Sequence, residues 1–188
     1  MAKNKKCEYG YIDKEKKRQL LFTILFIVIG LVIFFVGYFL NNRTKTNVFT
    51  ILAILMVLPM AKRLVAFLVL FPYKTKTVDF HERVCNLVEE SATVIEDYVF
   101  TSSEKVMGLS VLILDRGNAI GLVTNEKQPY DYMNAYLRKT IQAVSPNQKV
   151  KLVKSFEQLE REYKNLIPGT VNEAQEQAVL SRIKSFAV

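Results

Sequence analysis

The chain has 188 residues, half of them hydrophobic, and a formal net charge of +8. Its mean hydropathy of +0.12 would suit an ordinary globular protein, but the apolar residues are concentrated in two blocks near the N-terminus. The segment from Pro72 to Val188 carries equal numbers of acidic and basic residues, so the positive excess belongs to the part before it. This distribution excludes a basic nucleic-acid-binding domain, and no nucleic acid is expected as a partner.

The first block predicts a membrane anchor. Residues 1–19 form a basic tail with seven Lys or Arg residues, and the following run, 20–40, contains no charge. At ~1.5 Å per residue this run spans roughly 31 Å, which matches the hydrocarbon core of a bilayer. Its end lacks the small-x-small site of a cleaved signal peptide. Gly30 and Gly37 share one helix face, which indicates either close approach of another helix, the second block being the nearest candidate, or the usual frequency of glycine in membrane helices.

The second block is interrupted by two adjacent cations, Lys62 and Arg63. A Lys or Arg at the bilayer centre costs about 2.5–3.5 kcal/mol on insertion scales. We favour a span over residues 47–62, in which the Lys62 stem reaches the headgroups, followed by an apolar extension over 64–72. The alternative is that the two cations face a partner subunit or a polar pocket.

Together the two blocks predict a transmembrane hairpin over residues 20–72, embedded in the lipid bilayer. The connector between the helices is short and polar, and it holds only two basic residues. Lys and Arg are far more numerous in the tail and after the second helix. The positive-inside rule therefore places both termini in the cytoplasm and the chain in the cytoplasmic (inner) membrane.

Residues 79–188 predict a small soluble α/β domain with the element order α-β-β-β-α-β-α-α. Asp79 and Glu82 form a capping-box pattern at its start, and Asp115–Asn118 is a strong hairpin-turn signal. The expected helices are 79–92, 130–144, 156–167 and 170–186, the last of them capped by Thr170, and the expected strands are 98–101, 106–114, 119–124 and 149–153.

The strands 106–114 and 119–124, the turn at Gly117 and the element order over residues 80–153 resemble the restriction-endonuclease-like fold. More narrowly, they resemble nuclease-related domains that are attached to membrane helices. The resemblance implies a divalent-metal site built from an Asp on the second strand and a Glu-x-Lys on the third. Neither strand has an interior carboxylate here: Asp115 lies in the turn, and Glu126 follows the third strand at the wrong spacing. The resemblance therefore implies this fold without its metal site.

The membrane segment from Pro59 to Lys74 is also similar to small two-helix membrane proteins of Gram-positive bacteria that have no assigned function. This second resemblance favours a bacterial origin and implies no mechanism.

Other candidate groups in the domain are weaker signals. His81 and Cys85 share a helix face, but two ligands rarely make a metal site, and Cys7 fits no metal or redox spacing with Cys85. We interpret the remaining groups as solvated faces or core residues: the carboxylates Glu89, Glu90, Glu96 and Asp97, and the tyrosines Tyr130, Tyr132 and Tyr136. No catalytic residue, metal or cofactor is expected.

The leading hypothesis is a membrane-anchored, non-enzymatic accessory or regulatory protein whose cytosolic domain binds a membrane or cytosolic protein. One alternative is a membrane-tethered, metal-dependent nuclease. The other is a small subunit of a membrane transport complex, in which Lys62 and Arg63 would be the functional groups.

Overall fold

A computed structural model of the chain describes residues 8–41, 47–125, 127–167, 169 and 173–188. The chain divides into two compact units, one of them Ile12–Pro72 and the other built mainly from Tyr73–Val188. The first is a helix pair and the second a small domain with a mixed sheet, which confirms the predicted architecture at this level.

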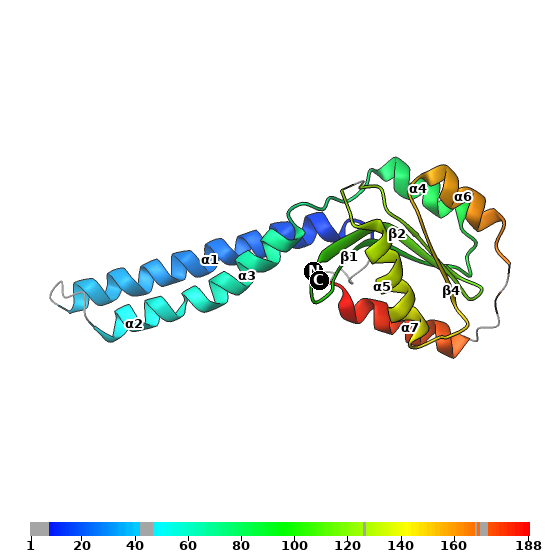
Figure 1. Cartoon of the computed structure of the whole chain (residues 1–188). Helices are drawn as coiled ribbons and strands as arrows, with labels where there is room; N and C mark the ends of the chain where they lie inside the picture. Colours follow the sequence, from blue (N-terminus) through cyan, green and yellow to red (C-terminus); the bar gives the residue numbers. More distant parts are fainter. Residues whose placement is uncertain (1–7, 42–46, 126, 168, 170–172) are drawn as a thin grey trace. The chain divides into compact units, whose positions relative to one another are not determined.

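The first unit is a helical hairpin in which α1 (Tyr11–Leu40) runs beside α2 (Val48–Leu55) and α3 (Val57–Leu70) (Figure 1). The helices Tyr11–Leu40 and Val48–Leu70 are both long and apolar enough to cross a membrane. Helix α1 begins at Tyr11, so the second half of the expected tail is helical. Gly10, whose φ is 80°, directly precedes the helix, and no helix breaker follows it before the apolar run. Residues 1–7 of the expected tail lie outside the described residues.

In the second helix of the hairpin, no helix break marks the expected boundary between the span 47–62 and the apolar extension 64–72. Helix α3 runs without interruption through Lys62 and Arg63, and the break lies earlier, at Met56. Pro59 explains this position, because its missing N–H falls in the first turn of α3, where no intrahelical acceptor is needed. The placement of the membrane boundary at Lys62 stays a prediction.

The second unit is a four-stranded sheet in the order β1-β2-β3-β4. Strands β1 (Thr93–Thr101), β2 (Val106–Asp115) and β3 (Asn118–Leu122) are antiparallel, whereas β4 (Lys149–Val153) runs parallel to β3. Figure 1 shows helices on both faces of the sheet. These helices are α4 (Val78–Leu87) and α6 (Phe156–Lys164) on one face, and α5 (Tyr130–Gln142) and α7 (Glu173–Phe186) on the other.

Successive side chains along each strand point to opposite faces of the sheet, so each face has its own apolar core. Under α5 and α7, Leu112 packs with Met133 and Leu137. Under α4 and α6, the neighbouring Ile113 packs with Leu159. Both faces of the sheet are therefore covered by helices.

Two helix caps differ from the sequence prediction. Helix α4 is capped by Thr77, whose side chain accepts a hydrogen bond from the N–H of Phe80, whereas Asp79 lies in the first turn rather than at the cap. Thr77 stands directly before the first helical residue, and its extended backbone suits a cap. The Thr170 cap expected for the last helix lies outside the described residues.

Candidate functional site

The two glycines of the hairpin lie against the second helix. A Cβ on Gly37 would overlap the Cβ of Phe49, so this position requires glycine. A Cβ on Gly30 would lie 3.5 Å from the Cβ of Met56, an ordinary contact. Gly30 instead lines an apolar groove of about 320 Å³ within the hairpin. Close helix approach therefore accounts for Gly37 and not for Gly30.

The two adjacent cations of α3 have different surroundings. The Arg63 guanidinium lies 5.2 Å from the centre of the Phe22 ring, and its Nη1 lies 3.4 Å from Oε1 of Gln19 on α1. Gln19 in turn hydrogen bonds to Glu15, and both side chains are buried. Lys62 is exposed. Arg63 is thus part of a polar cluster inside the hairpin, whereas Lys62 projects outwards, as a snorkelling side chain would.

In the α/β domain, the structure brings His81 and Cys85 together with a buried carboxylate. Nδ1 of His81 lies 2.7 Å from Oε2 of Glu96, and the ring of Tyr9 stacks on the imidazole at a centroid distance of 4.3 Å. Cys85 Sγ lies 3.7 Å from Nε2 and 3.9 Å from Nδ1. A thiol almost equidistant from both ring nitrogens is in line with neither, which does not favour a nucleophile activated by a base.

The expectation that Glu96 and Asp97 form a solvated pair is not what the structure shows. Their exposed fractions are 5% and 4%. Asp97 has a φ of 52°, and the register pairs Glu96 with Val111 and Tyr98 with Leu109, so Asp97 forms a bulge. Its carboxylate accepts a hydrogen bond from Thr75. Burial raises the pKa of Glu96, while His81 acts in the opposite direction.

The turn between β2 and β3 is a tight hairpin, and the buried side chains of Asp115 and Asn118 at its base are hydrogen bonded. Arg116 and Gly117 both have positive φ, as a type I′ turn requires. Asp115 is 4% exposed and accepts a hydrogen bond of 2.9 Å from the Tyr163 hydroxyl. The Asn118 amide donates to the carbonyls of Arg116 and Ile167. Burial raises the pKa of Tyr163, so its hydroxyl remains a donor to the carboxylate.

The surface carboxylates and the candidate metal ligands give no further site among the described residues. Glu89 is exposed and pairs with Arg116, in agreement with its interpretation as a solvated residue, and Glu90 is also exposed. No group of three or more His, Cys, Asp or Glu side chains in the described part of the chain is arranged to hold a metal ion. Glu126 lies outside that part.

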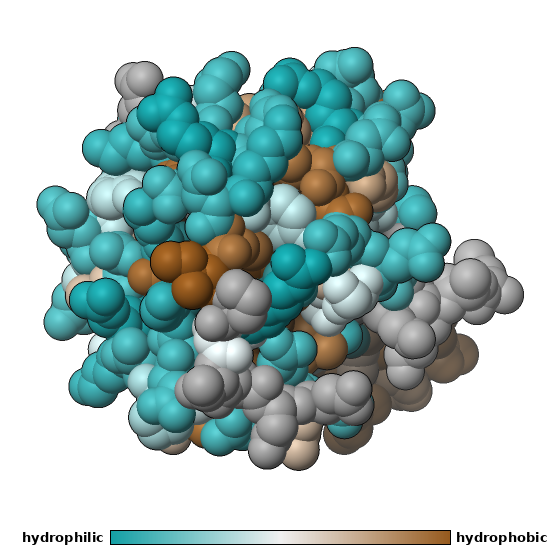
Figure 2. Space-filling model, turned by 90° about the vertical axis from the view of Figure 1, so that its right-hand side faces the viewer, coloured by the Kyte–Doolittle hydropathy of each residue, from teal (hydrophilic) through white to brown (hydrophobic). Residues whose placement is uncertain are grey.

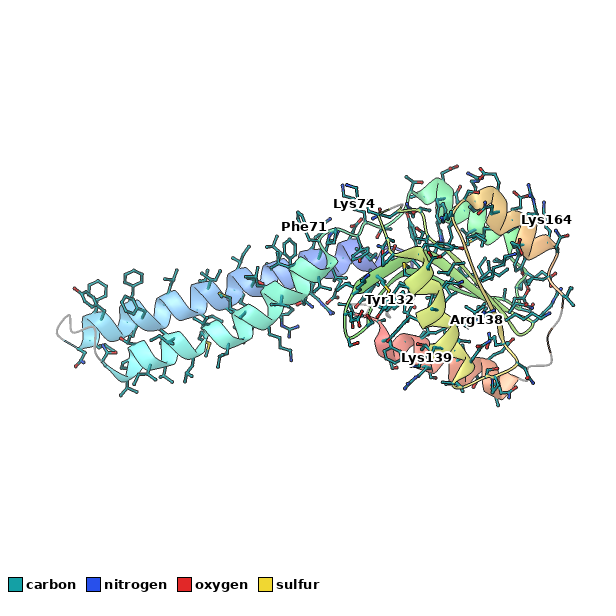
Figure 3. All side chains as sticks on the ribbon, viewed as in Figure 1. Phe71, Lys74, Tyr132, Arg138, Lys139 and Lys164 are labelled. Carbon is teal, nitrogen blue, oxygen red and sulfur yellow. The ribbon has the colours of Figure 1, made fainter. Side chains whose placement is uncertain are left out.

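The three tyrosines of α5 pack against the core as expected, and Tyr132 and Tyr136 share one side of the helix. Tyr132 stacks on Tyr136, and its hydroxyl donates to Ser102. Tyr130 donates to the carbonyl of Leu152 on β4. Figure 3 shows Tyr132 and Arg138 leaving α5 in different directions.

A groove between α5 and the edge strand β4 is the cavity with the most distinctive chemistry. Its volume is about 640 Å³, within the range of ligand sites. One wall is a single face of α5 and the other is β4 with the turn before it. The polar side chains that line the groove include those of Asn134, Arg138, Gln142, Gln148 and Lys149. We call this cavity the α5–β4 groove.

The α5–β4 groove contains buried polar atoms that have no hydrogen-bond partner among the described residues. Gln148 is 1% exposed, and neither its Oε1 nor its Nε2 is hydrogen bonded. Oδ1 of Asn134 is also buried without a partner. Because an unpaired buried polar group costs about 1–3 kcal/mol, such groups mark a place where a ligand can complete the hydrogen bonding.

The sequence did not single out this groove. Gln148 follows a Pro146–Asn147 turn, where a polar residue is ordinary, and no spacing marks it as buried. The only signal is the helical spacing of Asn134, Arg138 and Gln142, which places polar residues on one face of an otherwise amphipathic helix.

The surface of the α/β domain gives no competing apolar site in the view of Figure 2. That face is mainly hydrophilic, and its apolar residues form small separate areas. Comparisons of the chain with protein-family models, with curated proteins and with solved structures found no match.

Proposed function

We propose that the chain is a membrane-anchored, non-enzymatic accessory or regulatory protein. In this proposal both hairpin helices span the cytoplasmic membrane, both termini are cytoplasmic, and the α/β domain binds another protein at the inner face. The length and apolar composition of the two helices and the Lys/Arg asymmetry of their flanks support the anchor.

One observation carries the binding role: the buried carboxylates of the domain already have partners, whereas the buried amides of the α5–β4 groove do not. Glu96 pairs with His81, and Asp115 accepts a hydrogen bond from Tyr163. Carboxylates held in this way serve the fold. The unpaired amides of Gln148 and Asn134 offer hydrogen bonds without acid–base chemistry, which suits a binding surface.

The restriction-endonuclease-like resemblance remains a proposal about the fold. Three antiparallel strands, a fourth strand parallel to the third and helices on both faces support it. We infer no nuclease activity, because Asp115 lies at the end of β2, bound to Tyr163, and β3 carries no carboxylate. Purified chain with Mg²⁺ or Mn²⁺ should leave single- and double-stranded substrates intact; cleavage that Asp115→Ala abolishes would contradict this assignment.

Affinity purification of the full chain from detergent-solubilised membranes tests the binding role. A stoichiometric partner protein should follow the chain, and recovery of the chain alone from its native cells would overturn the proposal. Cysteine labelling of intact cells tests the topology: a thiol introduced at Thr44 should react from outside, whereas Cys85 should not.

The different surroundings of Lys62 and Arg63 sharpen the hairpin part of the proposal. Lys62→Leu should leave membrane levels and partner recovery unchanged, because its side chain is exposed. Arg63→Leu removes the contacts with Gln19 and Phe22 and should weaken the hairpin, with lower recovery of the folded chain. Loss of the partner in Lys62→Leu, at unchanged membrane levels, would favour the alternative role in a transport complex.

A further inference from the structure

The α5–β4 groove lies along an unpaired sheet edge. The sheet order ends at β4, so among the described residues only β3 pairs with this strand. A groove between an edge strand and a helix is the geometry in which an extended peptide can add to a sheet as a further strand. The groove therefore has the shape of a peptide site.

The main-chain hydrogen bonds of β4 show which residues face the groove. The N–H of Lys149 donates to Gly117, and the carbonyl of Val153 accepts from Val123, so both point towards the β3 side. Alternation then directs the main-chain groups of Val150 and Leu152 to the opposite edge. The hydroxyl of Tyr130, which bonds the Leu152 carbonyl from the groove side, agrees with this assignment.

The unpaired amides select the hydrogen-bonding character of the occupant. Gln148 presents one donor and one acceptor whichever way its amide is turned, and Asn134 presents a further acceptor. The occupant must therefore both donate and accept hydrogen bonds. A peptide main chain offers a donor and an acceptor in every residue other than proline, spaced along an extended strand, whereas an inorganic phosphate dianion offers a single O–H donor.

Charge and burial select the side chains of the occupant. Val150 and Leu152 belong to the core beneath α5, whereas Lys151 pairs with Glu162 on the α6 side. A strand added beside β4 would place alternate side chains against these two rows. Lys149 and the exposed Arg138 form no salt bridge within the described residues and flank the groove with positive charge. An acidic side chain beside Lys149 on one side of the added strand and another beside Arg138 on the other side, with apolar side chains next to Val150 and Leu152, would match both rows.

We propose that the α5–β4 groove binds an extended acidic segment of a partner protein by strand addition to β4. This proposal rests on the binding function proposed above and names the chemistry of the partner at one site. On the α6 side of the added strand an acidic residue lies beside Lys149. On the α5 side an acidic residue lies beside Arg138 and apolar residues lie beside Val150 and Leu152, and the main chain completes the hydrogen bonding of Val150, Gln148 and Asn134.

The test uses the full chain in lipid nanodiscs and a phage-displayed library of random dodecapeptides. The enriched sequences should be rich in acidic and apolar residues and poor in basic ones. A synthetic peptide of the consensus sequence should bind at least about tenfold more weakly to Arg138→Glu. The matched control is Lys139→Glu, the same charge change at the next residue of α5, outside the groove lining, and it should bind as the wild type does (Figure 3).

A second variant addresses the main chain directly. Val150→Pro removes an N–H that faces the groove and leaves the pairing of Lys149 and Val153 with β3 intact. It should abolish peptide binding while circular dichroism stays unchanged. The surface variants at Arg138 and Lys139 keep the proposal testable if Val150→Pro fails to fold.

Several results would overturn the proposal. One is no enrichment of any sequence over the library background. Another is equal binding of the peptide by the wild type and by Arg138→Glu. A third is enrichment of basic peptides that copy residues 149–153, because such peptides would indicate that a second copy of the chain is the occupant. Protection of α5 and β4 from hydrogen exchange by ATP, with no peptide bound, would assign the groove to a small anion. Equal recovery of a native partner by wild type and Arg138→Glu would refute the groove alone, whereas recovery of no partner by the wild type would refute the proposed function.

Discussion

The α/β domain contains two turns that lead into strands of the sheet and bury similar polar residues. The turns differ in whether these buried side chains have hydrogen-bond partners. At the β2–β3 turn, the buried side chains of Asp115 and Asn118 are hydrogen bonded to other parts of the domain. At the turn before β4, Gln148 and Ser145 are 1% and 0% exposed, and their side-chain polar atoms have no partner in the described structure. In the first turn the domain itself supplies the hydrogen-bond partners, and we call it the closed turn. In the second turn, among the described residues, it supplies none for these side chains, and we call it the open turn.

The difference separates groups that stabilise the fold from groups that are available to a ligand. Residue type does not distinguish them, because both turns contain amides and hydrogen-bonding side chains in buried positions. The distinction lies in whether a second element supplies the missing partner. For Asp115 this element is α6, through Tyr163, whereas α5 supplies none for the Gln148 side chain.

Removing the partner of the closed turn should have the largest effect. Tyr163→Phe leaves the Asp115 carboxylate buried with one hydrogen bond fewer, and we expect a loss of about 1–3 kcal/mol in the free energy of unfolding. Thermal unfolding in detergent, followed by near-ultraviolet circular dichroism, measures it. Tyr136→Phe is the matched control, because its hydroxyl makes only an exposed bond of 3.4 Å, and it should change little.

The conformation of the closed turn should have the next largest effect. Gly117 has a φ of 73°, which a β-branched side chain strongly disfavours, so Gly117→Val should lower the unfolding free energy by about 1–2 kcal/mol. Gly117→Asn, which tolerates the left-handed region, should lose much less. Equal losses in the two variants would assign the effect to side-chain size rather than to backbone conformation.

The open turn should respond with the opposite sign. Gln148→Leu removes an unpaired donor and acceptor from a buried position, and we expect a gain of about 1 kcal/mol in the unfolding free energy, accompanied by loss of peptide binding. Gln158→Leu is the control, since Gln158 accepts a hydrogen bond from the N–H of Lys154 and offers no such gain. A destabilised Gln148→Leu variant would remove the distinction between the two turns.

Glu96, a buried carboxylate that is paired with His81, should have the smallest effect on the unfolding free energy. Because burial raises its pKa above the ordinary value of 4.5, the folded chain binds more protons than the unfolded chain between the two pKa values. The unfolding free energy contributed by this group should therefore fall as the pH rises from about 4.5 through the folded pKa. Glu96→Gln should flatten that part of the pH profile, and an unchanged profile would show that another group causes it.

Much of the fold could be predicted from local patterns. The strand over residues 149–153 has the same bounds in the sequence prediction and in the structure, because a proline turn and a helix signal enclose it. The turn at Asp115–Asn118 follows from glycine at a left-handed position. By contrast, β1 begins at Thr93 rather than at residue 98, because Glu96 and Asp97 look like solvent residues and only their buried partners make them part of a strand.

The site was predicted less well than the fold. Lys62 and Arg63 stand out in the sequence because charge is rare in an apolar run, but only the structure distinguishes the exposed Lys62 from the Arg63 that contacts α1. Gln148 carries no local signal at all. Whether its amide has a partner depends on α5, and such a relation between distant segments cannot be read from the spacing of residues.

The two edges of the sheet also determine how many partners the domain can hold. Strand β1 is interrupted by the bulge at Asp97, and beyond it the C-terminal residues cover the edge, since Phe100 pairs with Ala187 and the N–H of Val188 donates to Val99. An open-ended fibril formed by strand addition needs two accessible edges in every copy. If a strand adds to β4 as proposed, the bulge and these C-terminal residues obstruct a second addition at β1, so we expect each domain to take up one added strand and to terminate the assembly.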